Sequence, residues 1–231
     1  MKYSFVQIVK RSMCVLIIIA FVPNLYSQEK MVVNDHEGVT YYDDFSKNLS
    51  SLNKLPRIIV YNIQNLIKTS MGEFSPDVTF SNGQIVDLKR YFAHNKDVSS
   101  YMWIVPKYDL NFNLTDTSMG FKNYTLNINT DKYGQIIDIN WPRRGYDHKS
   151  VFVSRDSIKK FALAEAKRLN FNLINYKVDF YYSKRDEKFL WQFLFPVFKE
   201  PLPGLPYNCI EINWANIGDS KTYQVNKASY N

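Results

Sequence analysis

Histidines and a carboxylate pair are the residues of this chain whose types could support acid–base or metal chemistry. His36 has an acidic residue on either side and could join a metal site. Residues adjacent in sequence rarely point at one ion, so we interpret this segment as a loop. His148 follows Asp147 in the polar stretch "RRGYDHKS", which we interpret as a connection between domains, and the third histidine is His94.

Asp43 and Asp44 form the carboxylate pair, in "YYDDF". Glycoside hydrolysis needs two carboxyl groups that face each other across about 5 to 9 Å, which neighbours in sequence do not provide. The chain also lacks a Gly-x-Ser-x-Gly elbow, a His-Glu-x-x-His motif, a phosphate-binding glycine-rich loop and a calcium loop. We therefore predict no catalytic residue, no metal ligand, no cofactor-binding residue and no cofactor.

Residues 1–27 have the composition of a secretory signal peptide. They carry three basic residues and no acidic one, followed by the apolar run "CVLIIIAFV" and the small residue Ser27. A membrane span needs about 20 apolar residues, roughly twice what precedes Pro23. We predict cleavage before Gln28 and an exported mature chain, periplasmic or secreted, without a stable membrane span. An uncleaved anchor is the alternative.

Export would limit both the kinds of partner that the chain can meet and the redox state of its cysteines. The net charge of +7 falls when the leader is lost, and the remaining Lys and Arg are dispersed. Nucleic-acid-binding domains cluster such residues, so we expect no nucleic-acid partner. Cys209 is the single cysteine outside the leader, which excludes an intramolecular disulfide. It begins an alternating run, so we interpret it as a small apolar residue at a strand start rather than as a nucleophile.

Two segments have the apolar spacing of amphipathic helices. The first, residues 56–71, begins with Pro56, which suits a first helical turn, and Gly72 follows its end. The second, residues 154–170, begins with Ser154, a residue type that caps helices. We expect each helix to bury one apolar side.

Runs rich in β-formers follow each helix. Residues 176–182 and 189–195 are predicted strands, and Asn82-Gly83 in "DVTFSNGQIVDL" predicts a hairpin turn. The stretch at 124–140 is similar to that at 209–226, and we interpret both as closing hairpins.

Alternation within these hairpins assigns their faces. We predict that the apolar positions point into the core, namely Leu126, Ile128, Ile210 and Ile212. We predict that the polar positions lie on a wetter face, namely Asn127, Asn129, Glu211 and Asn213.

Together these elements predict an α+β fold of two helix-plus-antiparallel-sheet units, possibly a tandem duplication. A leader at 1–27 and an N-terminal segment at 28–55 would precede a first unit at 56–149, with an inserted hairpin, and a second at 150–231. A single α+β domain whose strands are similar by chance is the alternative.

The second unit resembles the PepSY-like domain of exported bacterial proteins and protease propeptides. The resemblance rests on "SIKKFALAEAKRLN", "YKVDFYYSKRDEKFLWQFLF" and "CIEINWANIGDSKTYQV", over roughly 155–226 and more weakly over 56–140. It implies one helix across a small antiparallel sheet, and a non-catalytic binding or inhibitory module. The insertion "PVFKEPLPGLP" departs from the family pattern.

That proline-rich insertion is our candidate binding surface, because prolines stiffen it and Leu202, Leu205 and Tyr207 could contact a partner at low entropic cost. Covering a sheet edge is the alternative role. We expect a module that binds a protein or glycan of the cell envelope. The alternative is an exported enzyme of hydrolase type whose site is assembled from dispersed residues. Aromatic residues, 16% of the chain, are expected mostly in the core.

Overall fold

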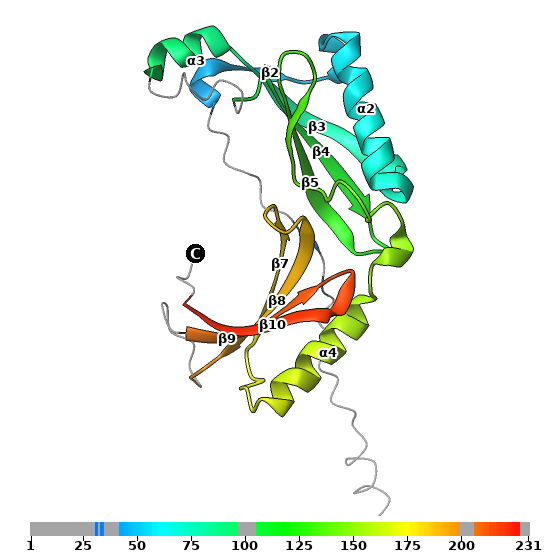
Figure 1. Ribbon diagram of the computed structural model, residues 1–231, viewed down its shortest axis with the longest axis vertical. Coiled ribbons are helices and arrows are strands. Elements are labelled where there is room, and N and C mark those ends of the chain that lie inside the picture. Colours follow the sequence, from blue (N-terminus) through cyan, green and yellow to red (C-terminus); the bar gives the residue numbers. More distant parts are fainter. Residues whose placement is uncertain (1–30, 32, 35–41, 97–104, 199–205, 227–231) are drawn as a thin grey trace, which may run out of the picture. The chain divides into compact units, whose positions relative to one another are not determined.

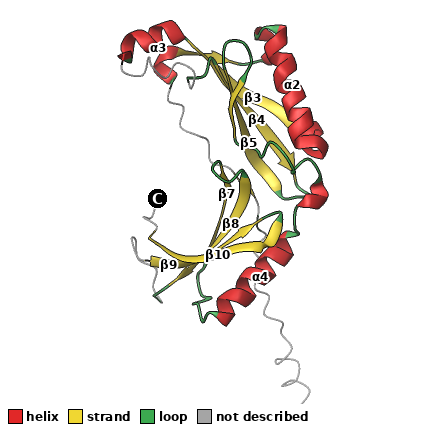
Figure 2. Ribbon diagram, in the orientation of Figure 1, coloured by secondary structure: helices red, strands yellow, loops and turns green. Residues whose placement is uncertain are grey.

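The computed structural model describes residues 31, 33–34, 42–96, 105–198 and 206–226. The expected signal peptide, His36 and most of the proline-rich insertion, including Leu202 and Leu205, lie outside the described residues. Within the described part the chain has a mixed α+β fold, in which helices accompany two mainly antiparallel sheets (Figures 1 and 2).

The first sheet has the strand order β1-β5-β4-β3-β2, and β6 also pairs with β5. The short pairing of β1 with β5 is parallel, and the other pairings are antiparallel. Its strands are β1 (Val33–Asn34), β2 (Ser46–Leu49), β3 (Val78–Val86), β4 (Tyr108–Asp116), β5 (Phe121–Thr130) and β6 (Ile136–Ile139).

Helix α2 (Arg57–Met71) confirms the first predicted helix and lies along one face of this sheet (Figure 2). Pro56 occupies its N-cap position, and its buried side chains recur at helical spacing: Ile59, Ile63, Ile67, Ser70 and Met71. The helix ends at Gly72, whose φ is +46°. A Cβ atom there would lie 2.2 Å from the carbonyl oxygen of Asp147, so this close approach needs glycine.

The predicted hairpin at Asn82-Gly83 is wrong. Both residues lie within the continuous strand β3, which pairs along its length with β4 and has a bulge between Phe80 and Asn82. Gly83 does not have the positive φ that a tight hairpin turn requires. A Cβ atom on it would lie 2.8 Å from the carbonyl oxygen of Asp109, so glycine serves strand packing here. The preference for a local turn is outweighed by this pairing.

The second sheet is a four-stranded meander in the order β10-β9-β8-β7, preceded by helix α4 (Arg155–Arg168). Ser154 caps α4 as expected, because its hydroxyl accepts a hydrogen bond from the Ser157 amide at 3.3 Å. The strands are β7 (Lys177–Ser183), β8 (Lys188–Pro196), β9 (Pro206–Asn213) and β10 (Asn216–Asn226). Strands β7 and β8 confirm the two predicted runs.

Short helical turns join these elements. A second α-helix of the first half, α3 (Leu88–His94), follows β3 and was not expected from the sequence. The 3-10 helices are η1 (Asp43–Phe45), η2 (Leu52–Lys54), η3 (Gly72–Asp77) and η5 (Lys149–Val151).

The predicted inward positions of the two hairpins are confirmed, since Leu126, Ile128, Ile210 and Ile212 are fully buried. The outward prediction is wrong for Glu211 and Asn213, which are only 8% and 5% exposed. The hydroxyls of Tyr181 and Tyr223 donate hydrogen bonds to Glu211 and help to bury it. Alternation along a strand assigns a side chain to one face of the sheet, but the neighbouring side chains determine its solvent exposure.

Aromatic rings form much of the core, as expected. The rings of Phe121 and Trp141 lie 5.9 Å apart, and those of Phe189 and Trp141 lie 4.9 Å apart. Phe189 and Trp214 both lie in the second half. The ring centroid of Phe121, in the first half, is 5.2 Å from that of Trp214. The described residues from Val33 onward belong to one compact unit, and these rings connect strands of both its sheets.

Candidate functional site

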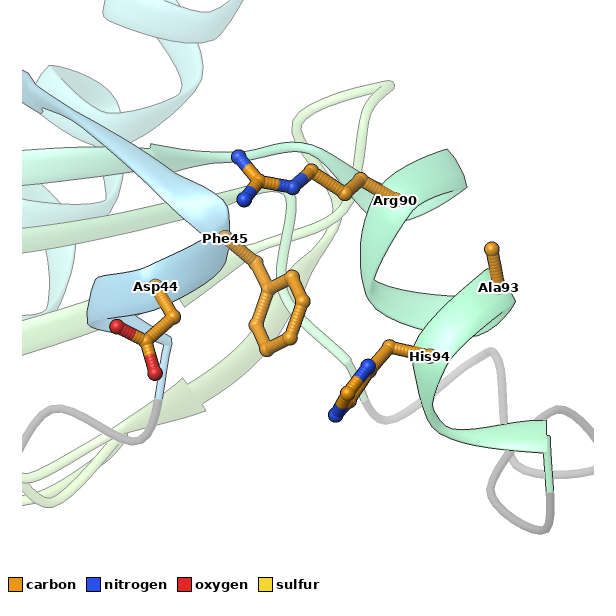
Figure 3. Close-up of a pocket in the computed structure, with 5 residues that line it drawn as sticks. All are labelled: Asp44, Phe45, Arg90, Ala93 and His94. Atoms are coloured by element: carbon orange, nitrogen blue, oxygen red, sulfur yellow. The ribbon is translucent and has the colours of Figure 1, made fainter.

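A pocket of about 480 Å³ opens between η1 and α3. Its described lining residues come from these two short elements: Asp44, Phe45, Arg90, Ala93 and His94. Figure 3 shows the Phe45 ring between the Arg90 side chain and the His94 ring. The pocket therefore combines an aromatic surface with a carboxylate, a guanidinium and an imidazole.

One backbone hydrogen bond joins η1 to the residue that caps α3. The Asp87 amide donates to the carbonyl oxygen of Phe45 at 2.7 Å, while the Asp87 carboxylate caps α3 by accepting from the Arg90 amide at 3.1 Å. Strand β2 begins directly after Phe45, and its Ser46 pairs with Val86 of β3. A strand pairing thus brings residue 45 beside residue 90.

The rings around Phe45 are in contact. The centroid of Phe45 lies 5.5 Å from that of Tyr91, edge-to-face, and 5.3 Å from that of His94 at a tilt of 41°. The guanidinium carbon of Arg90 lies 5.7 Å from the Phe45 centroid, within the range of a cation–π interaction. Tyr91 also contacts Tyr42, at 5.5 Å between centroids. Phe45 thus packs against Tyr91, His94 and Arg90 of α3.

A row of polar side chains lies on the face of the first sheet away from α2, and we call it the amide ladder. Asn127 donates to Asp109 at 2.7 Å and to Asn111 at 2.9 Å. Asn129 donates to Asn127, and Asn111 donates to Asn82, each at 2.9 Å. Most of these side chains are half-buried, so the network fixes amide groups that remain partly accessible.

Tyr42 packs against Tyr91 of α3, with 5.5 Å between the ring centroids. Burial raises the pKa of its hydroxyl, and the nearby Tyr91 and Asp109 raise it further. Tyr91 contacts the pocket ring Phe45, and Asp109 is a member of the ladder.

The second sheet has its own polar cluster, centred on Glu211. Its Oε2 atom accepts hydrogen bonds from the Tyr181 hydroxyl at 2.6 Å, the Tyr223 hydroxyl at 2.8 Å and the Gln192 amide at 3.2 Å. Burial raises the pKa of both tyrosines, and their hydrogen bonds to this carboxylate raise it further. Burial also raises the pKa of Tyr182 to about 12. The hydroxyls of Tyr181 and Tyr223 act as donors, and with Gln192 and Glu211 they cross-link all four strands.

A third cluster of charges joins η3 to the segment before α4. His148 Nδ1 lies 3.2 Å from Glu73 Oε1, and the Lys149 amide donates to Glu73 Oε2 at 2.7 Å. Lys149 Nζ lies 2.6 Å from Asp116 Oδ2. The hydrogen bond to Glu73, followed by the charge of Asp147, raises the pKa of His148. This arrangement fastens two distant segments together.

The structure brings together only two of the residues that the sequence suggested. Asp44 and His94 line the same pocket, whereas His148 belongs to the charge cluster. Cys209 is fully buried. Tyr207, a candidate partner contact, lies in β9 with 6% exposure and packs with Leu194 and Cys209.

Sequence reasoning missed Phe45, Arg90 and the amide ladder. A signal for the ladder was present, because asparagine recurs at every second position in "NFN" and "NIN", residues 111–113 and 127–129. Alternation places such residues on one face. Arg90 had no comparable signal, since its role depends on a strand pairing between residues more than thirty positions apart.

Comparisons with protein-family models, curated proteins and solved structures find no match to this chain. Among the described residues, no helix has the length and apolar character needed to cross a membrane. In the same part of the chain, no three His, Cys, Asp or Glu side chains gather as a metal would require.

Proposed function

We propose that this chain is an exported, non-catalytic binding or inhibitory module that acts on a protein or glycan partner in the cell envelope. The observation that carries the proposal is the combination of the pocket and the amide ladder. The pocket offers one aromatic ring held by its neighbours, and the ladder offers amide groups held by each other. Donors and acceptors fixed before binding lose little entropy when a partner arrives.

We also propose that the module consists of two PepSY-like units. Each half has a helix followed by an antiparallel meander: α2 precedes β3 to β6, and α4 precedes β7 to β10. Helix α3 would then be an insertion between β3 and β4. In each half the last two strands pair antiparallel as a closing hairpin, β5 with β6 and β9 with β10, which supports this proposal.

The alternative function is an exported hydrolase. The observation in its favour is that Asp44 and His94 line one pocket, because a carboxylate and an imidazole are the usual carriers of protons in hydrolysis. A binding module is the better-supported function, since the fixed network of the ladder presents groups that hold a ligand.

Affinity capture tests the proposal. The full chain with a C-terminal tag is incubated with envelope extract from its own cells, and bound protein and carbohydrate are both quantified. We expect saturable recovery of one partner, reduced roughly tenfold by Arg90→Ala or Asn111→Ala, as loss of about 1.4 kcal/mol would produce. Lys89→Ala, on the same helix and outside the pocket lining, is the matched control and should leave recovery unchanged.

Two results would contradict the proposal. The first is capture that is equally strong with all three variants, because the pocket and the ladder would then play no part. The second is hydrolytic turnover by the purified chain that disappears in both Asp44→Asn and His94→Ala, which would favour the enzyme.

A further inference from the structure

Four large apolar side chains are exposed at one end of the second sheet, and we call them the apolar tip. They are two pairs of consecutive residues, Leu173-Ile174 in the loop between α4 and β7, and Val197-Phe198 directly after β8. Their exposed fractions are 41%, 67%, 38% and 52%, in chain order. Single exposed apolar residues are common, whereas a group of them marks a contact surface.

Strand pairing brings the two pairs of the apolar tip to the same end of the sheet. Lys177 at the start of β7 is paired with Leu194 near the end of β8, so the preceding loop and the residues after β8 leave the sheet together. The Tyr176 ring stacks on that of Phe195 with 5.5 Å between centroids, and the Phe171 ring lies 5.9 Å from the same ring. These contacts anchor the loop to the end of β8.

Backbone amides in the apolar tip are hydrogen-bonded within the chain. The Ile174 amide donates to the side-chain oxygen of Asn172 at 3.0 Å, and the Val197 amide donates to the carbonyl oxygen of Pro206 at 3.3 Å. Hydrocarbon offers no partner to a backbone amide, so a segment that enters a bilayer must satisfy its amides internally. These two amides meet that requirement.

The charges around the apolar tip are mainly basic. Lys167 and Arg168 end α4 and Lys177 begins β7, whereas residues 169–178 and 188–198 contain no Asp or Glu. Glu165 pairs with Arg168 at 2.5 Å, so the two lysines provide the net positive charge. Lysines that border an exposed apolar surface complement an anionic bilayer, because they meet the phosphates while the apolar side chains enter the acyl boundary.

A lipid surface fits the apolar tip better than a second copy of the chain or another protein. Two copies that met at this end would bring the same lysines together, and like charges repel. Protein interfaces are enriched in Tyr, Trp and Arg, whereas none of the four side chains of the tip has a hydrogen-bonding group.

From these observations we infer that the apolar tip inserts into the surface of an anionic phospholipid bilayer and holds the chain against it. Its four side chains enter the outer part of the hydrocarbon, while Lys167 and Lys177 contact the phosphates. This inference goes beyond the proposed function and uses neither the pocket nor the amide ladder.

Vesicle flotation tests the inference with the exported chain, purified after removal of residues 1–27. The vesicles contain phosphatidylcholine, with or without phosphatidylglycerol, and we expect stronger binding to the anionic mixture. Ile174→Ser and Phe198→Ser should each weaken that binding about tenfold. Lys177→Gln should weaken it about fivefold. Ile58→Ser is the matched control and should leave binding unchanged, because Ile58 is 58% exposed on α2, away from the tip.

Tryptophan variants keep the inference testable where a serine variant fails to fold. Ile174→Trp retains an apolar side chain, so it should still bind, and its fluorescence should shift to shorter wavelength when vesicles are added. Ile58→Trp should bind equally well without that shift.

Several results would overturn the inference. Flotation that is equal in wild type and Ile174→Ser, or absent in both, would exclude insertion of the tip. A lipid-free dimer that Ile174→Ser dissociates would assign the tip to a second copy of the chain. A captured envelope protein that is lost in Ile174→Ser, without vesicle binding, would assign it to a protein. Partner capture by Arg90→Ala tests the proposed function separately, since Arg90 is not part of the tip.

Discussion

Glu211 of β9 and Tyr181 of β7 meet across the intervening strand β8, with 2.6 Å between the carboxylate Oε2 and the hydroxyl. The same oxygen also accepts from Tyr223 of β10 at 2.8 Å. Neither partner is adjacent to Glu211 in sequence, and the carboxylate is 8% exposed. One carboxylate oxygen thus connects the two outer strands of the second sheet.

Replacing Glu211 should therefore destabilise the protein. We expect Glu211→Leu to lower the free energy of unfolding by about 1 to 3 kcal/mol, because it removes the shared acceptor of two hydroxyls and an amide. Glu211→Gln should cost less, since its amide oxygen still accepts. Chemical denaturation measures both. Lys221→Ala, at the exposed position paired with Glu211 on β10, should stay within about 0.5 kcal/mol. Equal effects at the two positions would contradict the role of the cluster.

Ile212 and Asn213 are neighbours in β9, and both should matter to stability. We expect Ile212→Ala to cost about 2 to 5 kcal/mol through the cavity it leaves. Asn213→Ala should lower the free energy of unfolding by about 1 to 3 kcal/mol, because the Ala215 amide loses its acceptor and the hydrogen bond to Asp219 is lost. Thermal and urea unfolding provide the values. A negligible loss at Ile212 would mean that this hairpin is peripheral to the core.

The charge cluster should make stability depend on pH near neutrality. The pKa of His148 is raised in the folded protein, so its contribution is fully present below the unfolded pKa of about 6.5 and is lost as pH rises through the folded pKa. The stability lost in His148→Gln should accordingly be larger at pH 5.5 than at pH 8.5. Glu73→Gln should lower the pKa of His148, as measured by NMR titration of the imidazole. An unchanged imidazole titration in Glu73→Gln would refute the contact.

Gly72 and Gly145 form a matched pair for testing close packing. Both have positive φ, +46° and +78°, but a Cβ atom on Gly72 would lie 2.2 Å from Asp147 O, whereas Gly145 has nothing within 4 Å. We expect Gly145→Ala to cost about 1 to 2 kcal/mol, the strain of the left-handed conformation alone. Gly72→Ala should cost at least about 2 kcal/mol more, because backbone must also move. Equal losses of stability in denaturant titrations would show that η3 can shift freely.

The sequence predicted best those elements whose signals are local. Helix α2 has its apolar spacing and a proline at the start, and α4 has a serine cap, all within single segments. Helix α3 was missed because its seven residues are too few to display a period, although Asp87 caps it. The turn at Asn82-Gly83 failed because pairing with β4, more than twenty residues away, outweighs a dipeptide preference.

The candidate site was only partly accessible to sequence reasoning. Asp44 and His94 were both considered, but they lie fifty positions apart, and only the pairing of β2 with β3 brings η1 beside α3. The burial of Glu211 was missed for a similar reason, since its tyrosine partners lie 30 and 12 positions away. Residue types predicted candidate chemistry, whereas strand pairing determined which groups meet.

The ring of Phe189 lies 4.9 Å from that of Trp141 and 6.3 Å from that of Trp214. A fragment that ended between residues 142 and 150 would leave Trp141 without Phe189 and would expose several large rings to water, at a cost of about 1.5 to 3 kcal/mol for each. We therefore expect the two halves to unfold cooperatively, in a single transition that calorimetry can measure. By the same reasoning, we expect neither half to fold when it is expressed without the other.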